Sequence, residues 1–201
     1  MSLHQPSPID VQHSEPSGEF SQEERKTLLH LAHESILSAL EGRKISLDPS
    51  TPHFAEPRGA FTSLYLHGML RGCVGYVLPV SSIYRTVAET ARAAAFEDAR
   101  FHPVTLEEAP HLQIELSILS PPKPIAAEAV EVGRHGLLIS TPFRRGLLLP
   151  QVPIEHHWDR LTFLEQTCRK AGLPSDAWQK GAVLEAFTAE VFGEKPQTGG
   201  N

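Results

Sequence analysis

The stretch HLQIELSIL, residues 111–119, decides which class of fold this sequence predicts. Apolar residues occupy every second position from Leu112 to Ile118, and polar residues, among them Glu115, occupy the positions between. A period of two residues is the pattern of a β-strand with one buried and one polar face, which is typical of antiparallel sheets. The segment therefore predicts such a strand, with Glu115 on its polar face.

A hairpin is predicted upstream of this strand. AFTSLYL, residues 60–66, is rich in residues that favour strands, and LRGCVGYV, residues 70–77, follows after a turn that contains glycine. Two short β-rich segments separated by such a turn are typical of a β-hairpin. The sequence thus predicts at least three antiparallel strands.

Helices are predicted on either side of these strands. Ser21 and Glu24 have the spacing of a capping box, and apolar residues at helical spacing continue from there to Gly42. Further amphipathic helices are predicted at residues 82–97 and 158–171, while residues 43–58 read as a loop.

The C-terminal part predicts more short strands. The segments 130–132, 137–141 and 146–149 are apolar and are separated by glycine-containing turns, and residues 182–192 are rich in β-branched and aromatic residues. Hairpins mixed with helices indicate an α+β fold with a largely antiparallel sheet flanked by helices.

Composition sets the domain limits. The chain has 201 residues, of which 40% are hydrophobic, which suits one globular domain over residues 21–194. Residues 1–20 and 195–201 are poor in apolar residues, so we expect disordered tails there. The N-terminus lacks a basic start with an apolar centre, and no apolar run approaches the roughly 18 residues of a membrane span. We therefore expect a cytoplasmic protein that does not contact a membrane.

Charge is unevenly distributed. The net charge is −6, but residues 58–100 carry five arginines against three acidic residues. Duplex binding requires a strongly basic face, so nucleic acid is the weakest candidate partner. A small anionic ligand needs only two or three arginines, and this segment contains them.

LRGCVGY, residues 70–76, is the main candidate for a functional motif. In a strand, Arg71, Cys73 and Gly75 share one face, and an arginine beside a thiol favours the reactive thiolate. Glycine in a strand marks a close approach by a ligand or by backbone, so Gly72 and Gly75 are candidate ligand-binding positions with Arg71. Alternatively Cys73 is a small buried residue and the glycines admit a packed element.

A catalytic cysteine requires a base and an orienting group. His102 and Glu115 are the candidates, although a packing histidine and a solvated glutamate are the ordinary interpretations. Arg100 either contacts a ligand or holds a carboxylate in its own loop, for instance Asp98. Sequence spacing alone does not bring these residues together.

No metal or cofactor site is predicted. Cys73 and Cys168 are far apart, without a second cysteine at metal-ligand spacing. The adjacent residues of EHHW, 155–158, do not converge unless a loop folds sharply, and they read as a turn before a helix. No glycine-rich phosphate loop or cysteine triplet for an iron–sulfur cluster is present.

Several of these motifs together resemble the AMME syndrome candidate protein family, whose bacterial and archaeal members are called AmmeMemoRadiSam system protein A. The resemblance covers residues 21–194. The matching segments are LRGCVGY (70–76), DARFHPVTLEE (98–108), IELSILSPP (114–122), VGRHGLLIS (132–140), RRGLLLPQV (144–152) and AEVFGE (189–194).

The resemblance implies a two-lobed α+β fold with a cleft, the smaller lobe falling within residues 121–160. It implies no established activity, but bacterial members are encoded beside a Memo-like protein and a radical SAM protein. The leading hypothesis is therefore an accessory or ligand-binding component that acts with these partners. The alternatives are an enzyme that uses Cys73 with Arg71 on a small anionic substrate or modified nucleotide, and a nucleic-acid-binding protein.

Overall fold

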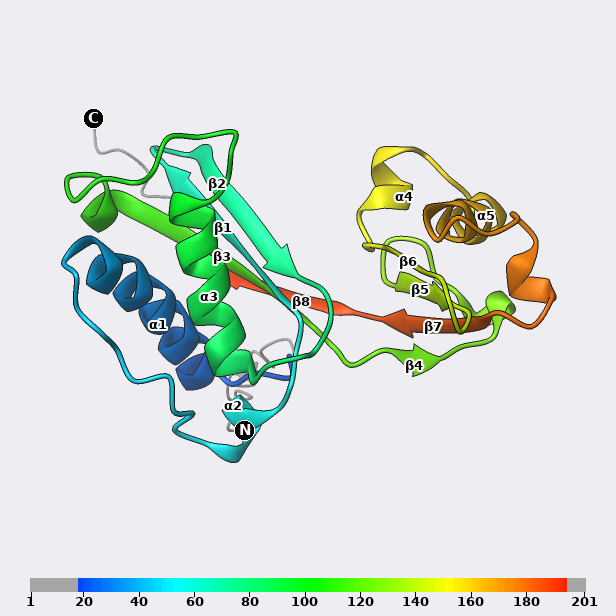
Figure 1. Ribbon diagram of the computed structural model, residues 1–201, viewed down its shortest axis with the longest axis horizontal. Helices are drawn as coiled ribbons and strands as arrows, with labels where there is room; N and C mark the ends of the chain where they lie inside the picture. The colour runs from blue at the N-terminus through cyan, green and yellow to red at the C-terminus, as the bar shows by residue number, and fades with distance from the viewer. Residues whose placement is uncertain (1–17, 195–201) are drawn as a thin grey trace, which may run out of the picture.

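Two antiparallel sheets organise the computed structural model, which describes residues 18–194 (Figure 1). The first sheet has the order β2 (Met69–Tyr76), β1 (Ala60–Leu66), β3 (Leu112–Leu119), β8 (Ala189–Gly193). The second has the order β4 (Lys123–Pro124), β7 (Val183–Phe187), β5 (Gly136–Ser140), β6 (Arg145–Leu148). The predicted α+β class with antiparallel sheets is confirmed.

Helices cover one face of the first sheet. The helices of this larger lobe are α1 (Gln22–Leu40), α2 (Pro52–Ala55) and α3 (Ile83–Phe96). α1 begins with the predicted capping box of Ser21 and Glu24, and α3 is capped by Ser82. α3 packs on β1 and β2, and α1 packs on β3 and on α3. Leu64 of β1 and Leu116 of β3 are fully buried beneath them. The short helix α2 was not predicted.

The alternation predicted for residues 112–118 is confirmed. The apolar side chains of β3 are buried against the helices, while Glu115 and Ser117 lie on the opposite face. In the sheet register Ser63 lies opposite both Cys73 and Glu115, so these three residues form a row across β2, β1 and β3.

The second lobe has a core of its own. α5 (Arg160–Lys170) packs on β5 and β6, and its residues Phe163 and Leu164 are buried with Leu137 of β5. The buried residues of this lobe form clusters that are separate from the core of the first lobe. The lobe also contains the unpredicted helix α4 (Val152–Glu155).

One strand prediction was wrong and another needs correction. Residues 130–132 follow a 3₁₀ turn at Ala127–Ala129 and are not a strand. Residues 182–192 form two strands, β7 and β8, that belong to different sheets and are separated at Thr188. The second sheet consequently spans residues 123–187 and extends well beyond residue 160.

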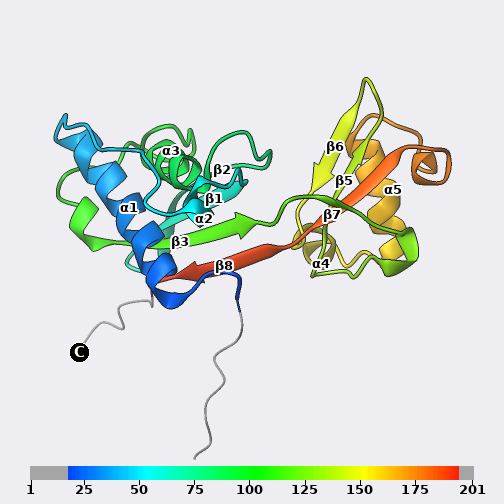
Figure 2. The same ribbon diagram turned by 90° about the horizontal axis from the view of Figure 1, so that it is seen from below.

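The lobes are joined by two adjacent segments of chain, β3 to β4 and β7 to β8 (Figures 1 and 2). Ser120 and Thr188 link these segments: the Ser120 N–H donates to the Thr188 carbonyl and the Thr188 N–H donates to Ser120 Oγ, both at 2.9 Å. The two crossings therefore run as one antiparallel pair.

The described chain begins within the predicted N-terminal tail. Residues 1–17 and 195–201 lie outside the described residues, but Phe20 is buried in the first core and stacks on His53. Phe20, which was expected to belong to the tail, is therefore part of the first core. Among the described helices, none is long and apolar enough to cross a membrane.

Candidate functional site

A cavity of about 890 Å³ lies between the open face of the first sheet and the second lobe. Its floor is the row Cys73, Ser63 and Glu115 together with residues of β3 and β8. Its wall comes from the segment 149–155, which includes α4, and from the turn at Gly133 and Arg134. The predicted residues Cys73 and Glu115 therefore line the same cleft, brought together by adjacent antiparallel strands.

Ser63 connects the ends of this row. Its hydroxyl donates to Cys73 Sγ at 3.3 Å, and it lies opposite Glu115 in the sheet register. Glu115 is half-buried and has no hydrogen-bond or ion-pair partner among the side chains of residues 18–194. Burial, and then the charge of Glu115, raises the pKa of the neighbouring Tyr65.

Arg71 lies outside the cleft, contrary to the expected shared face with Cys73. The register of β1 and β2 shifts so that Tyr65 pairs with Leu70, and Arg71 is the unpaired residue of a bulge. The Arg71 guanidinium donates to both carboxylate oxygens of Glu108, at 3.1 and 2.9 Å, and to the carbonyls of His102 and Pro103. Its donors are thus committed to holding the loop after α3.

His102 and Arg100 also lie outside the cleft. They border a shallow depression of about 400 Å³ on the outer side of β2 with Arg71. The contact from His102 to Arg71 is made by its backbone carbonyl. The predicted set of Cys73, His102 and Glu115 is therefore not assembled, because His102 belongs to a different surface.

Arg100 holds Asp98, as one of the two interpretations proposed. Its guanidinium donates to both Asp98 oxygens, at 2.9 and 2.7 Å, and holds the pKa of that carboxyl well below its usual range. Asp98 Oδ2 in turn accepts the Cys73 N–H at 2.8 Å. The two residues thus fix the backbone of β2 at Cys73.

The two glycines serve packing. Gly72 faces the helices, where a Cβ atom would overlap the Ala94 carbonyl of α3. Gly75 faces the cleft side, but the Phe61 ring lies against it and fills the space expected for a ligand. Both positions therefore accommodate neighbouring groups of the protein, as the alternative interpretation of the glycines proposed, and neither leaves space for a ligand.

The cleft favours a cationic group. Glu115 and Glu155 enter it from opposite lobes, and neither has an ion-pair partner among the described residues. The guanidinium that lines it, Arg134, is paired with Glu131 at 3.0 Å. Unpaired carboxylates attract cations and hydrogen-bond donors, so the cleft is less suited to the anionic ligand suggested by the arginine content of the sequence.

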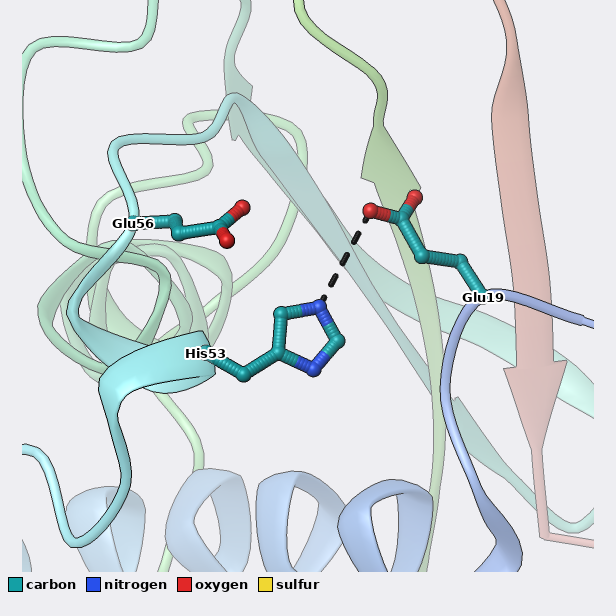
Figure 3. A group of neighbouring side chains, drawn as sticks. All are labelled: Glu19, His53 and Glu56. Carbon is teal, nitrogen blue, oxygen red and sulfur yellow. Dashed lines mark ion pairs between the residues drawn. The ribbon is translucent and has the colours of Figure 1, made fainter.

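One group of potential metal ligands lies elsewhere. Figure 3 shows Glu19, His53 and Glu56 pointing toward one another, with candidate ligand atoms within 4.8 Å. The Arg58 guanidinium, only 5% exposed, donates to both glutamates and supplies the positive charge that a metal ion would bring. His53 Nδ1 is bound to Glu24 at 2.7 Å, and this hydrogen bond, together with those from Ser21, lowers the pKa of Glu24 to about 2. The group is an ion-pair network that anchors the N-terminal segment.

Ser63 was missed from the sequence although a signal was present. AFTSLYL alternates like 112–118, with Phe61, Ser63 and Tyr65 on one face. This alternation places Ser63 on the open face, and the register then sets it opposite both Cys73 and Glu115.

Comparison with known proteins shows the family. The AMMECR1 family model matches residues 29–192. A protein of Methanopyrus kandleri is 40% identical, with 88% of this chain and 91% of the relative covered, and a protein of Aquifex aeolicus is 38% identical, with 87% and 94% covered. The crystal structure of an uncharacterized protein from Pyrococcus horikoshii is similar, with a TM-score of 0.66 at 37% identity, covering 84% of this chain and 90% of that one.

Proposed function

The chain belongs to the AMMECR1 family, and from this premise we propose that it is a ligand-binding accessory protein whose site is the cleft between the lobes. The proposal adds the partners that the resemblance implies, a Memo-like protein and a radical SAM protein. In this proposal, a ligand shared with these partners, or a segment of one partner, binds to the row Cys73, Ser63 and Glu115.

The unpaired carboxylate of Glu115 on the cleft floor carries this proposal. A half-buried carboxylate without a partner retains full capacity to accept hydrogen bonds, and a ligand that supplies a cation or donor gains a charge-assisted bond. The same charge repels a phosphate backbone, so nucleic acid is not included in the proposal.

Affinity capture tests the proposal. Tagged protein at native expression is expected to retain the Memo-like or the radical SAM partner. Ser117→Trp, which fills the cleft, and Glu115→Gln are expected to reduce this retention several-fold, while Glu107→Gln, which removes an exposed charge outside the cleft, leaves it unchanged. Retention of neither partner, or equal retention by all variants, contradicts the proposal.

An enzyme that uses Cys73 is the second candidate, because Cys73 Sγ lines the cleft beside Ser63 Oγ. No histidine lines the cleft among residues 18–194, so Glu115 is the remaining candidate for a base. A Cys73→Ser variant is expected to lose biological activity if the thiol is the nucleophile. If that variant keeps full activity and still captures a partner, the enzyme hypothesis is excluded and only the accessory function remains.

A further inference from the structure

β8 is an edge strand with open backbone groups. It is the last strand of the first sheet and pairs only with β3 among the described strands. The Ser120 N–H donates to the Thr188 carbonyl, and the Glu194 N–H donates to the Ile114 carbonyl. These two bonds show that the backbone groups of residues 188 and 194 point toward β3. Because antiparallel pairing alternates, the N–H and C=O groups of Ala189, Val191 and Gly193 point to the open side.

The other edge of the same sheet is closed. At Cys73 in β2, Asp98 accepts the N–H and Arg100 donates to the carbonyl at 3.4 Å. The loop held by Arg71 lies along the same edge. Proteins normally block an edge strand by such side chains or loops. The N-terminal segment contacts β8 through side chains, with Glu19 and Arg25 bonded to the Glu190 carboxylate. No described residue, however, bonds to the outward N–H and C=O groups of Ala189, Val191 and Gly193.

The open edge borders the cleft. Ala189 and Val191 line the cavity, and the Val191 side chain is 57% exposed. In a strand added beside β8, the residues that pair with Ala189, Val191 and Gly193 point to the same face as these residues do. Every second side chain of such a strand would therefore enter the cleft.

At Gly193, no side chain lies between the open edge of β8 and Glu115. Gly193 pairs directly with Glu115 in the register, and it has no side chain to separate Glu115 from the residue next along the row. That residue would lie about 10 Å from Glu115, two strand spacings away. A long lysine or arginine side chain can extend over Gly193 and bring its charge to the carboxylate.

We propose that an extended peptide segment of a partner protein adds to β8 as a fifth, antiparallel strand and places a lysine or arginine on Glu115. This inference rests on the proposed function of the cleft and specifies the class of ligand. The unpaired charge of Glu155 on the opposite wall favours the same basic segment. Backbone hydrogen bonds supply affinity in this binding mode, and alternate side chains supply specificity.

Three labelled heptapeptides of alternating valine and threonine, with lysine, glutamine or glutamate at the centre, provide the test by fluorescence anisotropy. We expect the lysine peptide to bind about fivefold to tenfold more tightly than the glutamate peptide, and added salt to reduce the difference. Glu115→Gln is expected to abolish the lysine preference, and Glu107→Gln to preserve it.

Val191→Pro tests the edge itself. The Val191 N–H faces the open side, so proline removes an edge donor without removing a bond to β3. We expect this variant to lose at least about tenfold in affinity for the lysine peptide, while Val191→Thr, which keeps the N–H, loses little. An unchanged melting temperature shows that the variant is folded, and the Glu115→Gln comparison provides an independent test should it unfold.

Three results overturn the inference. They are no saturable binding of the lysine peptide at millimolar concentration, equal binding of all three peptides, and a dimer of the free protein that Val191→Pro dissociates, since the dimer would assign the edge to a second copy. If any one of these results is obtained while Ser117→Trp and Glu115→Gln still reduce partner capture, strand addition fails and the proposed function of the cleft stands. If those cleft variants also capture normally, both fail.

Discussion

Asp98 occupies the position of a neighbouring strand beside Cys73: its Oδ2 atom accepts the Cys73 N–H at 2.8 Å, and its partner Arg100 donates to the Cys73 carbonyl. A carboxylate and a guanidinium thus satisfy the same backbone groups that another strand would satisfy. The motifs around residues 73 and 98 are therefore parts of one structural unit, which fixes the β2 backbone at Cys73 on the floor of the cleft.

Asp98→Asn is expected to destabilise the protein by about 1–3 kcal/mol, because it replaces the charged acceptor of the partly buried Cys73 N–H by a neutral one. The pKa of Asp98 is lower in the folded protein than in the unfolded chain, so its contribution is present above the unfolded value of about 3.9 and is lost as the pH falls through the folded value. Urea unfolding at several pH values between neutral and acidic measures how the free energy of unfolding depends on pH. The variant should show a weaker loss of stability in acid, whereas Asp48→Asn, at an exposed aspartate, should follow the wild type.

Arg71→Lys is expected to cost about 1–3 kcal/mol although it keeps the charge. Lysine cannot reproduce the bidentate contact with Glu108 while also reaching the carbonyls of residues 102 and 103. Arg85→Lys is the matched control, since Arg85 is exposed and 4.0 Å from Glu89, and it should change the free energy of unfolding by less than about 0.5 kcal/mol. Equal effects of the two substitutions would show that Arg71 does not hold the loop.

The two cysteines should differ in reactivity. Cys73 is partly exposed on the cleft, while Cys168 is 0% exposed in the second core, where burial raises the pKa of its thiol. Iodoacetamide should modify the folded protein once, at Cys73, and modify Cys168 only after denaturation. Mass spectrometry of wild type and Cys73→Ser resolves the two sites, and rapid labelling of Cys168 in the folded variant would contradict the described core.

Phe163→Ala should destabilise the second lobe selectively. Phe163 is 0% exposed in a core that is separate from the core of the first lobe, so truncation is expected to cost about 3–5 kcal/mol. Hydrogen exchange should show faster exchange in β5, β6 and β7 and little change in β1 and β3. Leu161→Ala on the exposed side of α5 is the control, and uniform loss of protection over both lobes would indicate a single cooperative unit.

Local patterns in the sequence predicted much of the fold. The alternation of residues 112–118 and the capping box at Ser21 depend on neighbouring residues alone, and both predictions agree with the structure. The division of residues 182–192 between two sheets was not predictable, because the two strands have similar composition and are distinguished by their distant partners.

The candidate site was predicted in part. Cys73 and Glu115 share the cleft because Ser63 pairs with both, but β3 is distant in the chain from the hairpin of β1 and β2, and local patterns do not set its register. The bulge at Arg71 likewise depends on how β1 pairs with β2, so simple alternation placed Arg71 on the wrong surface. Gly75 looked like a gap because nothing in its own strand indicates that Phe61 fills the space.

Protection of Cys73 in the captured complex tests the central claim most directly. The protein is isolated with its Memo-like or radical SAM partner, treated with iodoacetamide, and compared with the free protein for the rate of modification at Cys73. If the partner or its ligand occupies the cleft, Cys73 should react at least several-fold more slowly in the complex, and Glu115→Gln protein should yield little complex. An equal rate at Cys73 in the complex and in the free protein would contradict the assignment of the cleft as the functional site.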